Sequence, residues 1–391
     1  MKNQALIDKA LATVLARGEI PGLVATAADQ SGVIYSSAFG RRDIAGPARM
    51  TEDSVFRIAS MTKAITGTAA MQMVEQGKLS LDQPAQEILP FLADTKVLTG
   101  FGTGGVPIMR PRNGEITLRN LLTHTAGFVY DTWNGNMARY TQLTSLPAAR
   151  TGKLAALSAP LGFDPGERWE YGIGIDMVGR MVEVVSGLDL ETYFQRHIFG
   201  PLGMADSTYV ERSEWGNRLV PVHARAADGR MSILPSPPGP VTDREFFAGG
   251  GGLFCTAGDY LRFLRALMAG GELDGERILK PGTVALMGQN HMGDLNVLPM
   301  KTFNPPFSND VDLFPGMPKK WGLTFLINTQ DVPGRRSAGS LAWAGINNTY
   351  YWLDPTRAVA GVLMTQILPF ADKPVLDALD AFEAAVYESL S

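Results

Sequence analysis

The order of the predicted helices and strands is the feature that most constrains the fold. Apolar residues recur every three or four positions in 6–15 and in 374–390, which predicts a helix near each end of the chain. Alternating apolar stretches predict strands that follow the first helix and precede the last, at 22–28, 33–39, 321–328, 339–343, 349–354 and 358–365. This order predicts an α+β fold, in which an antiparallel sheet is flanked by the N- and C-terminal helices and a second lobe is mostly helical.

The middle of the chain differs in style from its ends. The whole chain has 391 residues, which exceeds the usual range of one domain. Residues 81–244 contain loops and short helical patterns, the clearest at 175–186 and 190–198, whereas 107–113 and 130–150 show no regular period and suggest irregular surface segments. The sequence therefore predicts a discontinuous sheet domain formed by 1–80 and 245–391, with 81–244 inserted as a mostly helical domain and a ligand cleft between them.

Composition excludes several classes of partner. The net charge is −4 and no run of lysine or arginine occurs, so neither a nucleic acid nor an anionic membrane is expected to bind. No stretch of 18 apolar residues occurs, and residues 1–18 suggest an amphipathic helix rather than a signal peptide. The single cysteine, Cys255, cannot form an internal disulfide and suggests a small buried residue. A soluble cytoplasmic protein of unknown oligomeric state is the expectation.

The residues Ser-Met-Thr-Lys at 60–63 carry the clearest chemical signal. They open the helical pattern at 61–76, and residues three apart on a helix lie on the same face, so the Ser60 hydroxyl and the Lys63 amine can form a hydrogen bond. A lysine in a dry pocket can act as a base, and N–H groups at a helix start suit a developing oxyanion. Ser60 is thus a candidate nucleophile, although the same pattern also describes a helix cap followed by a surface lysine.

Other catalytic arrangements find little support. No serine has glycine two positions before and two positions after it, which argues against a serine hydrolase of the α/β type. The four histidines show no metal-binding spacing, so no metal and no cofactor are expected, and His124 suggests a structural residue. The four glycines at 249–252 lack the Lys-Ser/Thr of a phosphate loop and suggest close backbone packing. Tyr171, in a turn-rich stretch before a helix, could either relay a proton or pack between lobes.

Taken together, these stretches resemble the serine β-lactamase and penicillin-binding-protein superfamily, in particular its class C branch and the family VIII carboxylesterases. The Ser-Met-Thr-Lys stretch follows Phe-Arg-Ile-Ala, as is typical of the first motif. Tyr-Gly-Ile at 171–173 stands where the superfamily has Tyr-x-Asn. The stretches at 121–127 (Leu-Leu-Thr-His-Thr-Ala-Gly), 249–253 (Gly-Gly-Gly-Gly-Leu) and 259–263 (Asp-Tyr-Leu-Arg-Phe) are similar to further motifs in the same order.

Departures from the superfamily pattern bear on the substrate. The β-lactamases and peptidases carry Lys-Thr-Gly on the strand that lines the cleft, whereas the corresponding residues 343–345 are Trp-Ala-Gly, similar to the Trp-Gly-Gly of the esterases. The missing lysine removes the cation that would hold a substrate carboxylate. The asparagine of Tyr-x-Asn is missing as well. A tryptophan at position 343 favours a neutral acyl or alcohol group.

The resemblance implies a set of roles. Ser60 would attack an ester carbonyl, and Lys63 with Tyr171 would share the base and acid work. The N–H groups of Ser60 and Ile346 would form the oxyanion hole. Further residues that the resemblance places in the cleft, for substrate binding or orientation, are Trp343, Gly345, Tyr130 and Asp176.

A serine carboxylesterase that hydrolyses short-acyl esters is therefore the main hypothesis, with a small-molecule ester as its partner. A β-lactamase or D-amino-acid peptidase is a second hypothesis, against which the tryptophan at 343 argues. An acyltransferase that uses the same acyl-enzyme cannot be separated from an esterase by sequence. A ligand-sensing module without catalysis is the non-enzymatic alternative.

Overall fold

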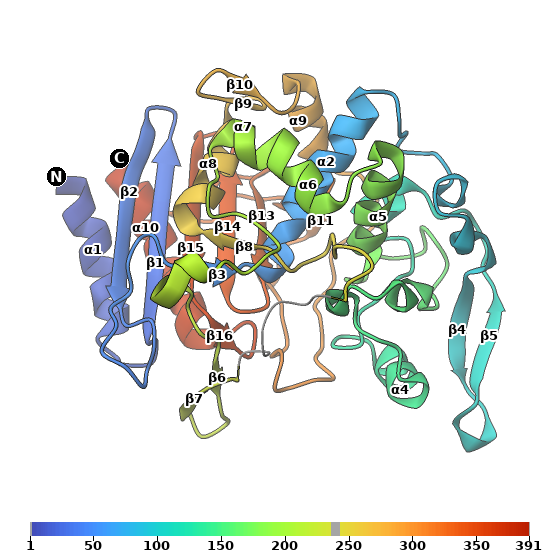
Figure 1. Cartoon of the computed structure of the whole chain (residues 1–391). Coiled ribbons are helices and arrows are strands. Elements are labelled where there is room, and N and C mark those ends of the chain that lie inside the picture. Colours follow the sequence, from blue (N-terminus) through green and yellow to red (C-terminus); the bar gives the residue numbers. More distant parts are fainter. Residues whose placement is uncertain (1, 236–242, 391) are drawn as a thin grey trace.

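A long antiparallel sheet is the centre of the fold (Figure 1). The computed structural model describes residues 2–235 and 243–390. Within this described part, the large sheet has seven strands, and its two halves come from opposite ends of the chain. Across the sheet, the strands lie in the order β11 (Lys319–Trp321), β12 (Leu326–Asn328), β13 (Leu341–Gly345), β14 (Thr349–Asp354), β15 (Val359–Met364), β1 (Gly22–Asp29) and β2 (Gly32–Gly40).

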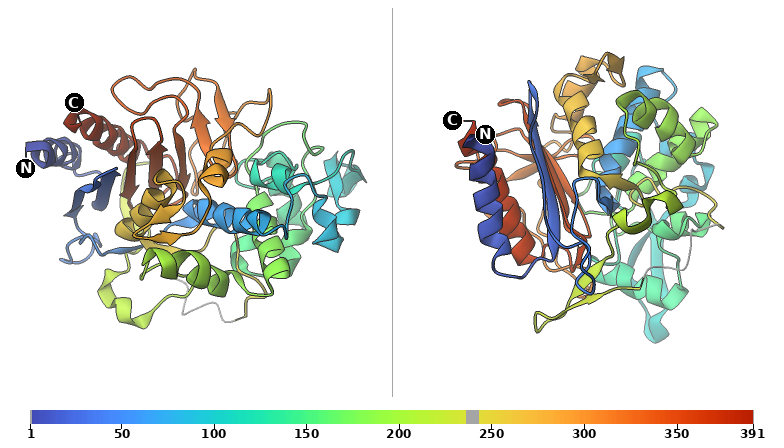
Figure 2. Two further views of the ribbon diagram at one scale, coloured as in Figure 1. Left: turned by 90° about the horizontal axis from the view of Figure 1, so that it is seen from above. Right: turned by 60° about the vertical axis from the view of Figure 1, so that its left-hand side comes forward.

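Helices cover both faces of this sheet. The terminal helices α1 (Lys2–Leu15) and α10 (Lys373–Ser389) pack side by side on one face, and α8 (Ala257–Met268) contacts β15 and β1 on the other (Figure 2). Because both faces are covered, every residue of β14 and β15 is buried, and these strands are almost continuously apolar. The predicted α+β architecture with flanking terminal helices is confirmed.

Helices and short turns dominate the segment between β2 and β8 (Phe254–Thr256). Its α-helices are α2 (Thr62–Glu75), α3 (Leu118–Leu122), α4 (Gly135–Thr144), α5 (Gly174–Ser186), α6 (Leu190–Phe194) and α7 (Gly200–Leu202). Helix α5 is strongly amphipathic, and it packs along α2, which starts at the candidate site. The predicted boundaries of a sheet domain at 1–80 and 245–391 and of an inserted domain at 81–244 stay a prediction.

Three local predictions were wrong. Residues 107–113 and 130–150 were predicted to be irregular, but the first range contains β5 (Pro107–Pro111), which forms a hairpin with β4 (Lys96–Phe101), and the second contains the helix α4. Glycines and prolines hide the hairpin, while α4 carries mostly polar residues and has no clear apolar stripe. The strand predicted at 321–328 is two strands, because the chain reverses after β11 at Gly322, where a side chain would collide with the carbonyl oxygen of Met287.

A pairing of two short strands brings the glycine run to the start of α2. Strand β3 (Val55–Arg57) pairs with β8 (Phe254–Thr256), so the residues that follow β3 and those that precede β8 lie together. The remaining short elements are β6 (His223–Arg225), β7 (Met231–Ile233), β9 (Glu272–Leu273), β10 (Glu276–Arg277), α9 (Pro281–Met287) and β16 (Ile367–Leu368).

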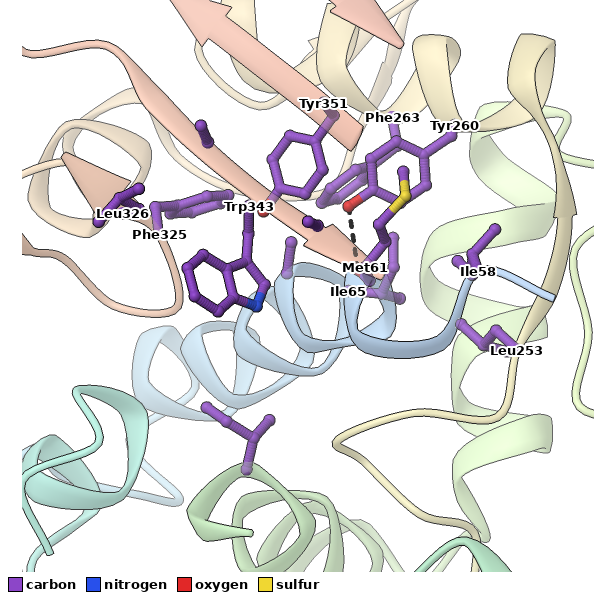
Figure 3. Close-up of a cluster of buried hydrophobic side chains, with 14 of the residues drawn as sticks. Ile58, Met61, Ile65, Leu253, Tyr260, Phe263, Phe325, Leu326, Trp343 and Tyr351 are labelled. Carbon is purple, nitrogen blue, oxygen red and sulfur yellow. Dashed lines mark hydrogen bonds between the residues drawn. The ribbon is translucent and has the colours of Figure 1, made fainter. Parts of the chain in front are cut away.

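The start of α2 rests on a tightly packed apolar cluster (Figure 3). Met61 and Ile65 point into this cluster and are fully buried, and the hydroxyl of Tyr260, from α8, donates to the carbonyl oxygen of Met61 at 2.9 Å. Trp343 of β13 borders the same cluster. The base of the candidate site is therefore rigid on its apolar side. In the described part of the chain, no helix combines the length and the apolar character that crossing a membrane requires.

Candidate active site

Ser60 lies in a strained turn between β3 and α2. The turn is a short 3-10 helix, Ala59–Met61, and Ala59 has a φ of 46°, which is rare for a residue with a side chain. Such a conformation costs about 1–3 kcal/mol and persists only where the surroundings enforce it. The Ser60 side chain is partly exposed at this point, and it therefore remains accessible to a ligand.

Lys63 lies directly behind Ser60 in the first turn of α2 and is fully buried. Its Nζ donates to Ser60 Oγ at 3.1 Å, to the Tyr130 hydroxyl at 3.1 Å and to the carbonyl oxygen of Gly250 at 2.7 Å. The hydrogen bond between Ser60 and Lys63 that the three-residue spacing predicts is thus confirmed. These three contacts hold the lysine head in one position.

Tyr130 is more closely connected to Lys63 than the sequence suggested. Burial of its hydroxyl, with smaller effects of Asp176 and Tyr171, raises the pKa of Tyr130 well above its usual value. Tyr130 therefore stays protonated at neutral pH and can both accept from Lys63 and donate a proton into the cleft. The side chains of Tyr130 and Ser60 are both partly exposed.

Tyr171 flanks Lys63 from the other side with its ring. Lys63 Nζ lies 4.8 Å from the centre of the Tyr171 ring, and the rings of Tyr171 and Tyr130 are 5.2 Å apart. The Tyr171 hydroxyl accepts a hydrogen bond from Trp343 Nε1 at 3.0 Å, which leaves its own proton free to be donated. The sequence placed Trp343 in the cleft without predicting this bond, which fixes the tryptophan on the strand side of the site.

Two glycines allow the backbone around the site to approach closely. A Cβ at Gly172 would lie 2.0 Å from the carbonyl oxygen of Phe128, so the Tyr-Gly-Ile stretch needs this glycine to place Tyr171. A Cβ at Gly345 would lie 2.3 Å from the carbonyl oxygen of Ile58. The end of β13 is therefore pressed against the turn that carries Ser60, and the partly exposed Ile346 comes next. The role of the Ile346 N–H in an oxyanion hole stays a prediction.

His124 is buried beside Tyr171 and supports it. The imidazole ring centre is 4.7 Å from that of Tyr171, and Nδ1 accepts from the N–H of Gly172 at 3.4 Å. Burial, and then the nearby charge of Lys63, lowers the pKa of His124 well below its usual value, so the ring is neutral. These contacts agree with the structural role predicted for this histidine.

Asp176 lies in the first turn of α5, beneath the lysine. It is 1% exposed, and one carboxylate oxygen accepts from the N–H of Gly250 at 2.9 Å. Burial raises its pKa, whereas the charge of Lys63 and the N–H of Gly250 oppose that rise. The predicted place of Asp176 near the cleft is therefore on its floor, where almost no surface is left for direct contact with a substrate.

The residues that sequence reasoning missed are an aromatic wall and a carbonyl group. Trp133 lies 5.4 Å from the Tyr171 ring, and Trp321 lies 4.6 Å from that of Trp343. No local motif indicates these tryptophans, which come from a loop before α4 and from β11. The glycine run was predicted to serve close packing, and a Cβ at Gly250 would indeed lie 2.6 Å from Asp176; its carbonyl contact with Lys63 gave no signal in the sequence.

Metal-binding and thiol groups are also accounted for in the described residues. Residues 2–235 and 243–390 contain no group of three or more His, Cys, Asp or Glu side chains arranged to hold a metal ion. Cys255 is buried as predicted, and burial raises the pKa of its thiol well above the usual value. It is therefore not a reactive thiolate at neutral pH.

Comparisons with known proteins agree with this geometry. A family described as Beta-lactamase matches residues 7–385. The chain is 32% identical to monacolin J acid methylbutanoyltransferase of Aspergillus terreus, over 98% of this chain and 95% of that protein. It is 33% identical to lovastatin esterase of Penicillium rubens, over 98% of both chains. A mutant simvastatin synthase of Aspergillus terreus superposes with a TM-score of 0.84 at 32% identity, covering 99% of this chain and 98% of that one.

Proposed function

The chain belongs to the β-lactamase family of serine acyl-transfer enzymes, and from that premise we propose that it is an acyltransferase. It would move a short acyl group from an ester donor, through an acyl-enzyme on Ser60, to the hydroxyl of an apolar acceptor. The observation that carries this proposal is the Ser60–Lys63–Tyr130 hydrogen-bonded unit, placed behind an aromatic wall. This proposal puts the acyltransferase, an alternative in the sequence analysis, ahead of the esterase, which was the main hypothesis there.

The first half-reaction follows from the contacts of Lys63. Lys63 Nζ takes the proton of Ser60 as Oγ attacks the carbonyl carbon of the donor ester, and N–H groups near the turn hold the oxyanion. The Tyr171 hydroxyl then gives its proton to the departing alcohol oxygen, which leaves a tyrosinate beside the Lys63 ammonium, whose Nζ lies 4.8 Å from the centre of the Tyr171 ring. Tyr130 keeps the lysine in place during both steps. The products are the Ser60 acyl ester and a free alcohol.

The second half-reaction reverses the first with a different alcohol. The acceptor hydroxyl loses its proton to the Lys63–tyrosine pair as its oxygen attacks the acyl carbon, and Ser60 recovers its proton. Tyr130 and Trp133 are partly exposed and give this path an aromatic surface that an apolar acceptor can cover, and the buried rings of Tyr171 and Trp343 lie behind them. Covering that surface displaces water and thereby favours transfer over hydrolysis.

The segment around 303–308, next to Trp133, adds apolar surface that suits an apolar acceptor. The indole N–H of Trp133 donates to Ser308 Oγ at 3.2 Å, and the N–H of Phe303 donates to the carbonyl oxygen of Thr132 at 2.8 Å. The segment around 303–308 is therefore attached to the loop before α4, and Phe303 is 54% exposed on it. A branched acyl group and a bulky apolar alcohol are accordingly the first substrates to try, in keeping with the name of the Aspergillus methylbutanoyltransferase.

The test is to partition the acyl-enzyme between water and an alcohol. The protein is supplied with p-nitrophenyl 2-methylbutanoate, with or without a bulky apolar alcohol, while nitrophenol, free acid and new ester are measured together. A transferase forms new ester in preference to acid, and Ser60→Ala abolishes both. Release of free acid at the same rate with and without the alcohol, and without new ester, would contradict transfer.

Esterase activity is the second candidate function, and the likeness to lovastatin esterase favours it. In that case the free acid would accumulate at the same rate whichever alcohol is added. A chromogenic cephalosporin serves as the third substrate, because Trp343 replaces the lysine that would hold its carboxylate. We expect little opening of that compound, and efficient opening would contradict our interpretation of Trp343.

A further inference from the structure

We propose that Asp176 is a positioning residue for the catalytic lysine and acts through the peptide groups of Gly250. The carboxylate accepts from the N–H of Gly250 at 2.9 Å, and the carbonyl oxygen of Gly250 accepts from Lys63 Nζ at 2.7 Å. The proposal rests on the proposed Ser60 chemistry. It gives Asp176, which the resemblance places in the cleft for substrate binding or orientation, a role as a buried carboxylate that acts on the base through the backbone.

The Asp176 carboxylate is too well enclosed to contact a substrate directly. Asp176 is 1% exposed, and its second oxygen has no hydrogen-bond partner among the described residues. An uncompensated buried carboxylate is costly unless a cation lies close by. Lys63 supplies that cation, because its charge stabilises the ionised form of Asp176. The carboxylate and the lysine head therefore interact across the Gly250 backbone, which contacts both of them.

The glycine at position 250 is part of this arrangement. A Cβ there would lie 2.6 Å from Asp176 Oδ2, which is closer than real contacts allow. Any other residue would separate the carboxylate from the backbone and would shift the carbonyl group that holds Lys63. A second hydrogen bond fixes the same backbone segment, because the Thr66 hydroxyl donates to the carbonyl oxygen of Gly249 at 2.7 Å.

The Asp176 carboxylate affects Lys63 most when Lys63 takes the proton of Ser60. At that moment Lys63 becomes an ammonium ion in a buried site, and the fixed negative charge of Asp176 stabilises it. The other titratable groups that face this pair are Tyr130, Tyr171 and His124 around Lys63, and Tyr130 and Tyr209 around Asp176.

The test variant is Asp176→Asn, which keeps the shape and the acceptor for Gly250 but removes the charge. The matched control is Glu183→Gln on the same helix, since Glu183 is a buried carboxylate that accepts from the N–H groups of Leu190 and Phe247 and has no contact with Lys63. The readout is the rate at which a fluorophosphonate ester labels Ser60 between pH 5 and 10, located by mass spectrometry. This rate reports the reactivity of Ser60 even if the natural substrate is unknown.

We expect Asp176→Asn to slow labelling at its optimum by about 10- to 100-fold. We also expect the acidic limb of its pH profile to move to lower pH by about one unit, since a neighbouring charge has been removed. Glu183→Gln should leave the pH profile in place. Partial unfolding would lower the amount labelled in either variant without moving the limb.

An unchanged rate and limb in folded Asp176→Asn would overturn the proposal. If that variant does not fold, Gly250→Ala tests the same connection, and labelling at the wild-type rate would be contrary evidence. Failure of the proposed function is a different result: Ser60 would still be labelled in the wild-type protein, but no ester would be formed or hydrolysed.

Discussion

Removing each tyrosine hydroxyl in turn separates the two roles that the site assigns. Tyr171→Phe removes the proposed acid, whereas Tyr130→Phe removes one of three acceptors around Lys63 Nζ. A positioned acid contributes about 10²- to 10⁴-fold, but only when the departing group needs a proton. A lost hydrogen bond to a charged group costs about 1.5–3 kcal/mol, which is about 10- to 150-fold in rate.

The assay compares two donor esters of the same acid. A p-nitrophenyl ester releases a stable anion and needs no proton, whereas a simple alkyl ester releases a strongly basic alkoxide and does. For Tyr171→Phe we expect kcat/KM to fall about 10²- to 10⁴-fold with the alkyl ester. With the p-nitrophenyl ester the loss should be only about 2- to 13-fold, the value of one neutral hydrogen bond to Trp343.

For Tyr130→Phe we expect equal losses with both esters, because a misplaced lysine slows attack on either. Equal losses in Tyr171→Phe, together with a selective loss of alkyl-ester activity in Tyr130→Phe, would refute the assignment and exchange the two roles. Circular dichroism and the melting temperature of each variant serve as the folding control.

Three further predictions concern close packing, a buried ion pair and a buried histidine. Gly172→Ala should abolish activity and lower Tm, since its Cβ would lie 2.0 Å from a carbonyl oxygen, while Gly282→Ala, where a Cβ meets open space, serves as the control in a thermal melt. Glu383→Gln should cost about 3–5 kcal/mol in urea unfolding, because Arg336 is left buried without its partner; a loss under 1 kcal/mol would contradict this. Burial lowers the pKa of His124 in the folded state, so stability should fall as pH drops below about 6.5, and His124→Gln should flatten that fall.

Much of the fold was predictable because its elements have regular patterns. The terminal helices and the strands that form the sheet show apolar periods, and their order along the chain specifies which ends meet. The hairpin β4–β5 and the helix α4 were not predictable, since one consists largely of glycine, proline and isolated apolar residues and the other is mainly polar. The reversal after β11 depends on a contact between Gly322 and a distant carbonyl group, which no local pattern records.

The candidate site was predictable only where its residues are close in sequence. Ser60 and Lys63 lie within one helical turn, so their contact follows from helix geometry. The contacts of Tyr130 with Lys63 and of Trp343 with Tyr171 join residues 67 and 172 positions apart, and they depend on how the lobes pack. The family resemblance named these positions, but only the structure shows which hydroxyl touches the lysine. The assigned roles of these residues stay predictions until the variants are measured.

The most direct test of the central claim is to trap and chase the acyl-enzyme. The protein is mixed with p-nitrophenyl 2-methylbutanoate, quenched within one turnover and analysed as intact protein and as peptides. The account predicts one added acyl group on Ser60, which disappears faster when an apolar alcohol is added and appears as the ester of that alcohol. An acyl group on another residue, or none at all while substrate is consumed, would contradict it.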